Sequence, residues 1–424
     1  MSISTRWWTP RRRNLTGAAV LTIGALALTA CSGVAGQTGD TTTNAAACAT
    51  ITIGAPLPLS GPYTAFGQTA LNGTELAVKE VNAAGGIKSL GGAKLKLEQS
   101  DTSSADTTQA ASATSKLISD GAVALLGAWS TVLTAAVAPV AERSEVPLIT
   151  TAWGDPLSAN GYKYYFQTSP KSSVFGGEGA QDVIAAAKAA GITFQNVLAI
   201  APNDAANQAQ YKAAVKTFTD AGANAPAPIF YAPPLTDVSA IVNTVVKAKP
   251  DLILTGGGPA DATLIVKGLR DAGVTAPLMG FGGAFAGTDP TWPAGVGDGV
   301  NGIMVVTAWN DDIPLDGVSE AAKAYTKAYG TAYMPDHAGV SWVNTHLLAD
   351  AIEKAASCDP ADIAAALRSI DVTSGPGAAI PGGQVSFDAT GINPHAVPLL
   401  LQWQGNVPVT IWPQDLATAK LVKG

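Results

Sequence analysis

Residues 51–67 read ITIGAPLPLSGPYTAFG, a short β-branched run that ends in a loop rich in Gly and Pro. An apolar run of this length between turn signals is typical of a buried strand. The Ala-rich stretch 69–81 follows closely and has the spacing of an amphipathic helix. The segment therefore predicts a strand, a loop and a helix, which together form the first unit of an α/β fold.

The same alternation of strand-like and helix-like segments continues along the chain, and it favours a parallel sheet covered by helices. A first series predicts strands at 51–55, 95–99, 123–126 and 147–149, and helices at 69–81, 107–119 and 134–141. A second series after Pro170 predicts strands at 197–201, 227–231, 251–254 and 277–279, and helices at 208–220, 238–248 and 261–272. The remainder predicts strands at 302–307, 384–387, 399–402 and 409–412, and helices at 319–329 and 337–356. We therefore expect two lobes of similar length and a return of the chain between them.

The first thirty residues have the features of an export signal. Arg6 and three further Arg at 11–13 precede an apolar stretch, 15–28, that is too short to span a bilayer. It ends in LTAC at 28–31, which resembles the bacterial lipobox and predicts a lipid on Cys31. Residues 31–48 would then be a flexible linker. A plain secretory peptide is the alternative, and the export route, general or twin-arginine, stays open.

Composition and charge exclude several classes of protein. The chain has 424 residues, 47% of them hydrophobic, with 25 basic and 32 acidic side chains. Residues 1–30 hold four Arg and no acidic residue, so their removal leaves 394 residues with a net charge of −11. This charge argues against a nucleic-acid partner. The length and the apolar content predict a globular protein with two lobes.

Cysteines and histidines are few. Outside the lipobox, Cys48 and Cys358 stand in a compartment that permits disulfides, so we expect a bridge that ties the N-terminus to a late helix. Two separate thiols are the alternative. His337 and His346 are nine residues apart on a predicted helix, which is not metal-ligand spacing, and we interpret them as surface or packing residues. The sequence has no nucleophile elbow, phosphate loop or zinc motif, so we expect no enzyme, cofactor or metal.

Several short motifs, in a fixed order, carry a resemblance to a known family. They are residues 53–67, Asn72-Gly73, EVNAAGGI at 80–87, GYKY at 161–164 with Phe166 and Pro170, Pro250-Asp251, and VSFD at 385–388 with Gly391. Together they resemble the branched-chain amino-acid-binding family, whose members are periplasmic or lipid-anchored receptors of ABC importers. The likeness runs from about residue 51 to residue 413.

The resemblance implies the type I periplasmic binding protein fold, with two Rossmann-like lobes, parallel central sheets, a three-strand hinge and one ligand in the cleft. Lobe 1 would comprise residues 49–170 and 308–385, and lobe 2 residues 171–307 and 386–424. The protein would then be a monomeric, extracytoplasmic receptor, anchored to the membrane by its lipid. Permease subunits and a separate ATPase would be its partners. A lobe that senses a ligand and reports to a membrane partner is the alternative.

Ligands of open parallel sheets gather at the carboxyl ends of the strands. In the first such loop, the resemblance implies that Tyr63 is an aromatic wall of the site. After the third strand, Ser130 or Thr131, next to Trp129, would hold a ligand carboxylate. Either residue could instead cap the following helix, or do both.

The loop after the fourth predicted strand contains Ala152, Trp153 and Gly154. The resemblance implies that its backbone amides and a Thr hydroxyl face the carboxylate, but Gly154 stands where that Thr is expected. Backbone donation survives this change, whereas the side-chain bond does not. Trp153 would stack on a flat or apolar ligand, or pack between loops.

Lobe 2 departs further from the family. Asn207 falls near a family Tyr, and Gly282 falls where an acidic residue pairs with the ligand amino group. A buried ammonium without a partner costs several kcal/mol, so an α-amino acid bound in the usual way is doubtful. Asp204 or Asp261 could substitute, although we expect both at solvated helix starts.

Three more residues complete the expected site, and the ligand class follows from the whole set. Gly257 would allow close backbone approach, and Phe175 and Phe281 would complete an apolar wall. We therefore expect a small polar or carboxylate-bearing metabolite with an apolar or aromatic body. A branched-chain amino acid and a small amide such as urea are the alternatives.

Overall fold

The computed structural model describes residues 48–282 and 285–423. The predicted signal at 1–30, the linker up to residue 47 and the lipidation site Cys31 lie outside the described residues. Among the described helices, none has both the length and the apolar character that crossing a membrane requires.

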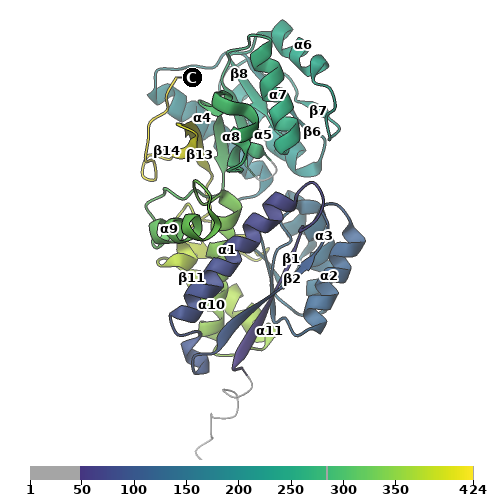
Figure 1. Cartoon of the computed structure of the whole chain (residues 1–424), viewed down its shortest axis with the longest axis vertical. Coiled ribbons are helices and arrows are strands. Elements are labelled where there is room, and N and C mark those ends of the chain that lie inside the picture. Colours follow the sequence, from purple (N-terminus) through teal and green to yellow (C-terminus); the bar gives the residue numbers. More distant parts are fainter. Residues whose placement is uncertain (1–47, 283–284, 424) are drawn as a thin grey trace, which may run out of the picture. The chain divides into compact units, whose positions relative to one another are not determined.

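The first sheet is built from five parallel strands, as the β-branched runs predict (Figure 1). Their order is β2 (Lys94–Asp101), β1 (Thr50–Leu57), β3 (Ala124–Leu126), β4 (Leu148–Thr150) and β5 (Tyr165–Gln167). β3, β4 and β5 are buried throughout, which is the usual state of parallel strands covered on both faces.

The second sheet has seven strands. The two strands that come last in the chain run antiparallel to their neighbours, which differs from the parallel central sheet that the resemblance implies. Their order is β14 (Val407–Trp412), β13 (Leu399–Gln404), β10 (Met304–Thr307), β9 (Leu278–Phe281), β8 (Leu252–Thr255), β6 (Val197–Pro202) and β7 (Ile229–Tyr231). β13 runs antiparallel to β10, and β14 antiparallel to β13. A tight turn at Gly405-Asn406 joins β13 to β14, which is possible only between antiparallel neighbours. The remaining strands, β11 (Asp371–Val372) and β12 (Val385–Ser386), pair with each other.

Helices cover both sheets. Those in the first half of the chain are α1 (Thr64–Ala83), α2 (Thr107–Ser119), α3 (Thr131–Arg143), α4 (Ser172–Ala189), α5 (Ala205–Asp220) and α6 (Ser239–Ala248). The later ones are α7 (Pro259–Asp271), α8 (Trp292–Val296), α9 (Val318–Tyr329), α10 (Asp336–Ala355) and α11 (Pro360–Arg368). Figure 1 shows α1 and α10 side by side, and their contact is the most extensive between any two elements of the described chain.

Late segments of the chain therefore return to early ones. Within the described residues, the chain leaves the first sheet after β5 and the second sheet after β10, and it re-enters the second sheet at β13 after α9 to α11 and the β11–β12 pair. Chain segments that connect two bodies in this way are the places where a hinge motion is absorbed. A disulfide joins Cys48, just before β1, to Cys358, just after α10, with a Cα–Cα distance of 6.0 Å.

Every predicted strand and helix is present, with ends shifted by a few residues. The helices and strands that the sequence pattern does not predict are α4, α8, α11, β5 and β11. The start of α4 reads SSVFGGEG, and three Gly within four residues weaken the helical pattern. Tertiary packing overrides that weak propensity, because α4 lies against α5 and against the strands β10, β13 and β14.

Helix α4 also carries a carboxyl group with an unusual titration. Burial, and then the nearby Glu178 carboxylate, raise the pKa of Asp182 to about 7, against an opposing effect of the Trp412 side chain. The unfolded chain titrates near 3.8. The folded state therefore holds this proton more tightly, and the resulting stability is complete below about pH 4 and lost as the pH rises through about 7.

We expect Asp182→Asn to raise the free energy of unfolding at pH 8 by on the order of 2 kcal/mol, and to change it little at pH 4. For a carboxyl group with this pKa shift and no contact with solvent, the change in the free energy of unfolding would be about twice as large. The partial exposure of Asp182 reduces the effect. Urea unfolding at both pH values measures the difference. Asp271→Asn, which alters an exposed carboxyl on α7, is the control. An equal effect of Asp182→Asn at both pH values would contradict the prediction.

Candidate functional site

A cavity of about 280 Å³ lies where loops from both sheets meet. Its lining comes from the carboxyl ends of β1 to β6 and β9 and from the start of α10. The lining residues are Tyr63, Ser104, Ala105, Trp129, Ser130, Thr131, Val132, Thr151, Trp153, Ser172, Asp204, Ala205, Ala206, Asn207, Gln210, Gly282 and His337. This is the position at which open parallel sheets bind ligands, and the volume suits a small metabolite.

Three aromatic side chains give the cavity apolar walls. Tyr63 and Trp129 contact each other, with ring centroids 4.9 Å apart. Trp153 lines another part of the cavity and packs on the buried Phe175 at 4.1 Å. Aromatic faces of this kind favour a flat or apolar ligand body.

Hydroxyl groups line another part of the cavity, and two of them are unsatisfied. Thr151 is 5% exposed and Ser172 is fully buried, and neither hydroxyl has a hydrogen-bond partner among the described residues. Buried polar atoms are rarely left in this state, so each calls for a partner that the protein does not supply. Both residues line the cavity, and a ligand oxygen can fill that role.

Ser130 and Thr131 lie at the start of α3, where Ser130 is the N-cap. Its hydroxyl accepts a hydrogen bond from the backbone N–H of Leu133 at 3.3 Å. The hydroxyl proton is not used in this bond, so Ser130 can cap the helix and still donate to a ligand.

Helix N-termini surround the cavity. First-turn residues of α3, α4 and α5 line it, namely Thr131, Ser172 and Ala205. The N-terminus of a helix carries a partial positive charge and free N–H groups, which attract anions. The cavity therefore combines helix ends with unsatisfied hydroxyls.

Formal charge is scarce in the cavity. Among the described residues, the lining includes no Lys or Arg and a single carboxylate, that of Asp204. Asp204 is exposed and caps α5, where it accepts from the Asn207 backbone N–H at 2.9 Å and from its amide Nδ2 at 2.6 Å. Burial, then Asp204 and Asp261, raise the pKa of Tyr63. The rim of the cavity near Tyr63 is thus its acidic side.

The two acids that the sequence offers as substitutes differ in position. Asp204 lies at a solvated helix start, as predicted, and borders the cavity. Asp261 was expected to be solvated, and this is wrong, because it is only 5% exposed. Its carboxylate accepts from the backbone N–H of Leu235 at 2.8 Å, since the 232–238 segment folds over the start of α7. Asp261 does not line the cavity.

The structure brings seven of the predicted ligand residues together around the cavity. They are Tyr63, Trp129, Ser130, Thr131, Trp153, Asn207 and Gly282. The loops that follow strands of the first sheet supply most of the set, because strand ends and helix starts there coincide with recognisable Gly, Pro, Ser and Thr signals in the sequence.

Five other predicted residues do not line this cavity: Ala152, Gly154, Phe175, Gly257 and Phe281. The Ala152 N–H donates to the Thr150 hydroxyl at 3.0 Å, so it is occupied within the loop. A Cβ on Gly154 would lie 2.2 Å from Thr131 Cγ2, so the space of the family Thr is filled by Thr131. Phe175 supports Trp153 from behind.

The two remaining residues belong to the packing beneath the second sheet's loops. Phe281 packs edge-on against Tyr211, with centroids 5.0 Å apart. Gly257 has a positive φ of 128° and lies close to the Tyr231 hydroxyl, so its lack of a side chain serves the loop itself.

Sequence reasoning missed several lining residues, chiefly Ser104, Thr151, Ser172, Gln210 and His337. Ser104 follows β2 and could have been found by the rule that ligands bind at strand ends. Its hydroxyl donates to Ser60 O at 2.6 Å and accepts from the Tyr63 N–H at 2.9 Å, so it fixes the Tyr63 loop. The sequence predicts His337 as a surface or packing residue. It is 3% exposed and packs against Phe66 and Trp129, which agrees with packing, but it also lines the cavity.

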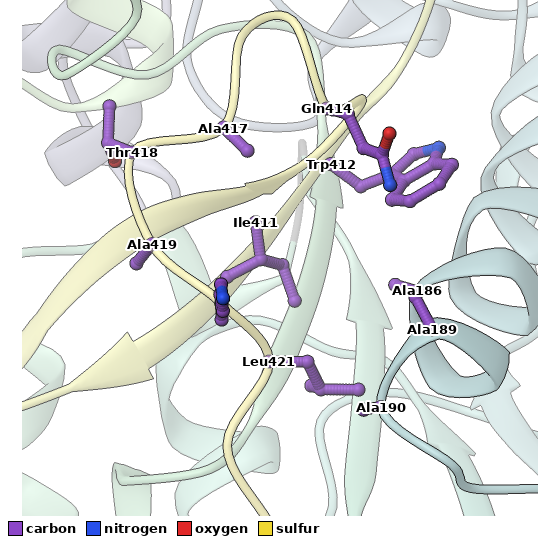
Figure 2. A pocket seen from close by; sticks show the side chains of 11 residues that line it. Ala186, Ala189, Ala190, Ile411, Trp412, Gln414, Ala417, Thr418, Ala419 and Leu421 are labelled. Atoms are coloured by element: carbon purple, nitrogen blue, oxygen red, sulfur yellow. The ribbon is translucent and has the colours of Figure 1, made fainter.

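A second hollow, of about 610 Å³, lies between α4 and the chain end that follows β14 (Figure 2). Figure 2 shows Trp412, Ile411 and Leu421 facing the Ala side chains at the end of α4. Its lining residues do not include any of the buried unpartnered polar side chains. The cavity at the strand ends is therefore the candidate binding site.

Relatives in sequence carry the name of homologues of Leu/Ile/Val-binding proteins. Leu/Ile/Val-binding protein homolog 8 of Brucella melitensis is 27% identical over 392 residues, which cover 89% of this chain and 94% of that protein. Homolog 7 of Brucella suis is 26% identical over 395 residues, covering 89% and 95%.

Solved structures share the fold. A leucine-binding protein of Thermotoga maritima has a TM-score of 0.71 at 23% identity, covering 86% of this chain and 100% of that one. An ABC-transporter solute-binding protein of Rhodopseudomonas palustris, in complex with benzoate, has a TM-score of 0.71 at 22% identity, covering 88% and 98%. Residues 50–404 match the model of a family of binding proteins, and the chain therefore belongs to the periplasmic binding protein family.

Proposed function

We propose that this protein is the extracytoplasmic solute-binding component of an ABC importer and catalyses no reaction itself. It binds a small carboxylate with an apolar or aromatic body in the cavity between the two lobes. Closure about the hinge traps the ligand, because the closed state binds it more tightly than the open state. A lipid on Cys31 anchors the protein to the membrane, where permease subunits with a separate ATPase receive the ligand.

The observation that carries this proposal is the pair of unsatisfied buried hydroxyls, Thr151 and Ser172, in a cavity bordered by helix N-termini. Helix ends and neutral hydroxyls stabilise a carboxylate without a basic side chain. These helix N-termini and neutral hydroxyls carry no negative charge that would stabilise a bound cation. The polar end of the cavity thus favours an anionic group.

The ligand body is argued from the walls. Tyr63, Trp129 and Trp153 offer aromatic surface in a space of about 280 Å³. A benzoate-sized or branched aliphatic acid matches both the volume and the walls. The benzoate complex of the Rhodopseudomonas palustris protein gives a precedent within the fold.

An α-amino acid is the second candidate, and Asp204 favours it. This carboxylate borders the cavity on the side of Tyr63, where an ammonium group would be stabilised. The Leu/Ile/Val-binding names of the relatives point the same way. Asp204 is exposed and already bonded to Asn207, so it is a weaker partner than a buried acid.

A thermal-shift screen with paired ligands tests the proposal. Benzoate, 3-phenylpropanoate with L-phenylalanine, and 4-methylpentanoate with L-leucine differ in the amino group or the body. A ligand at 100 times its dissociation constant stabilises the folded state by about 2.7 kcal/mol, which a melting curve resolves. We expect the acids to shift the melting temperature more than their amino-acid counterparts. No shift with any of these compounds would overturn the proposed ligand class.

Asp204→Asn distinguishes the two candidates. Asn caps a helix as well as Asp does, so the fold is preserved. We expect binding of the acids to be unchanged or up to about threefold tighter, because a nearby like charge is removed. If the ligand is an amino acid, its affinity falls by about tenfold. Asp359→Asn, at the N-cap of α11, is the matched control.

A further inference from the structure

Trp129 occupies a backbone conformation that needs support. Its φ is +69°, in the left-handed region that a bulky residue rarely adopts and that costs about 1–3 kcal/mol. Its indole lines the cavity and is only 5% exposed. The surrounding structure must support this backbone, and the position of the indole ring depends on the contacts of the ring itself.

Ring contacts alone do not fix the indole. Trp129 stacks on Phe66 with centroids 5.2 Å apart and planes at 12°, and it contacts Tyr63 at 4.9 Å. Stacked apolar faces resist separation but tolerate sliding within the plane. The directional contact is a hydrogen bond of 3.1 Å from Trp129 Nε1 to His337 Nε2.

His337 is itself rigidly placed at the start of α10. Its imidazole lies edge-on to Phe66 at 5.4 Å and to Trp129 at 5.8 Å. An indole N–H can only donate, so Nε2 of His337 must be the unprotonated acceptor. The ring proton then belongs on Nδ1, which lies 3.7 Å from the carboxylate of Asp336.

We propose that His337 is a positioning residue for ligand binding: its neutral imidazole holds the Trp129 indole in place as a wall of the cavity. This inference rests on the proposed function only in taking the cavity as the ligand site. Removal of the acceptor leaves a buried indole N–H unsatisfied, which allows the indole to move from its place in the wall of the cavity. A second proton on the His337 ring would also break this hydrogen bond, because the N–H of Nε2 would then face the N–H of the Trp129 indole.

The groups around His337 decide which of its two ring nitrogens carries the proton. Asp336, on the same helix, is buried, and burial raises its pKa to about 7 despite the Thr307 hydroxyl and the amides of Ala308 and Trp309. Tyr63 lies beyond Trp129, and Asp204 and Asp261 act on Tyr63. The carboxyl group of Asp336 faces Nδ1 at 3.7 Å, and a proton on Nδ1 is the tautomer that leaves Nε2 to accept from Trp129.

The first test observes the bond without any ligand. In a ¹H–¹⁵N spectrum, the indole resonance of Trp129 is assigned by its loss in Trp129→Phe. We expect His337→Leu to shift this resonance upfield and to speed its hydrogen exchange by at least tenfold, whereas His337→Gln, whose amide oxygen can accept, restores most of the wild-type signal.

The second test measures affinity for benzoate and 3-phenylpropanoate by calorimetry. His337→Leu weakens binding by about tenfold, and His337→Gln stays within about threefold. In a Trp129→Phe background, His337→Leu has no further effect. His346→Leu is the matched control, because His346 lies on the same helix and bonds to Glu80 at 3.0 Å outside the cavity.

The outcomes separate the two proposals. An indole resonance unchanged in His337→Leu overturns the positioning role, whatever the ligand. If neither probe binds the wild-type protein, the proposed ligand class falls and the indole resonance decides the positioning role by itself.

Discussion

Replacing Cys48 and Cys358 by Ala is expected to lower the free energy of unfolding by about 4–5 kcal/mol, the largest effect of any change considered for this chain. The disulfide closes a loop over a sequence separation of 310 residues. A cross-link of that span removes more chain entropy from the unfolded state than a short one does. The bond also ties the start of β1 to the segment that follows α10.

Urea unfolding, followed by circular dichroism, measures this effect. The wild-type protein with a reductant should reproduce the midpoint of the double variant, and the double variant should not respond to the reductant. A wild-type midpoint that is the same with and without the reductant would contradict the prediction. Ligand affinity should change by less than about threefold, because neither Cys lines the cavity.

The sequence predicts the regular part of this fold well because hydrophobic periodicity and helix caps are local. α2 follows an Asp106 N-cap that accepts from Thr108 and Gln109, and it begins and ends at the predicted residues. β5 escapes prediction because its three residues, YFQ, end in a polar Gln and include no β-branched residue, whereas the equally short β3 and β4 lie in apolar runs. Helix α4 is not predicted because its Gly residues weaken the local helical pattern. These Gly residues are explained by the packing of α4 against other elements, which a local pattern does not reveal.

The residues of the candidate site also divide into those that a local sequence pattern predicts and those that depend on the assembled fold. Tyr63, Thr131 and Trp153 stand in loops after strands, so a rule about strand ends finds them. His337 comes from the first turn of a helix 208 residues away from Trp129, and no local pattern links the two. Phe281 and Phe175 look like walls in sequence, but they pack one layer behind the cavity, and depth of burial is a property of the assembled fold.

Gly176→Ala is the second change with a large expected effect, because it acts where α4 and α5 touch. A Cβ on Gly176 would lie 2.0 Å from the backbone oxygen of Gln210. Backbone on both sides cannot move aside as a flexible side chain can, so the helices must separate. We expect the free energy of unfolding to fall by about 3 kcal/mol, at the upper end of the usual cost of overpacking.

The neighbouring Gly177 provides the matched control. It lies on the same helix, and a Cβ there would meet nothing within 4 Å. Gly177→Ala should therefore raise the free energy of unfolding by about 0.5–1 kcal/mol, the usual gain from Ala in a helix. The pair thus separates packing from helix propensity, and similar effects of the two changes would contradict the argument.

Ligand binding should report the same displacement. Ser172 and Gln210 both line the cavity, and they belong to the two helices that Gly176→Ala forces apart. We expect affinity for the acid that gives the largest thermal shift to fall by at least tenfold in Gly176→Ala and to stay unchanged in Gly177→Ala. Unaltered affinity in a destabilised Gly176→Ala protein would mean that the helix starts at the cavity move independently of the helix contact.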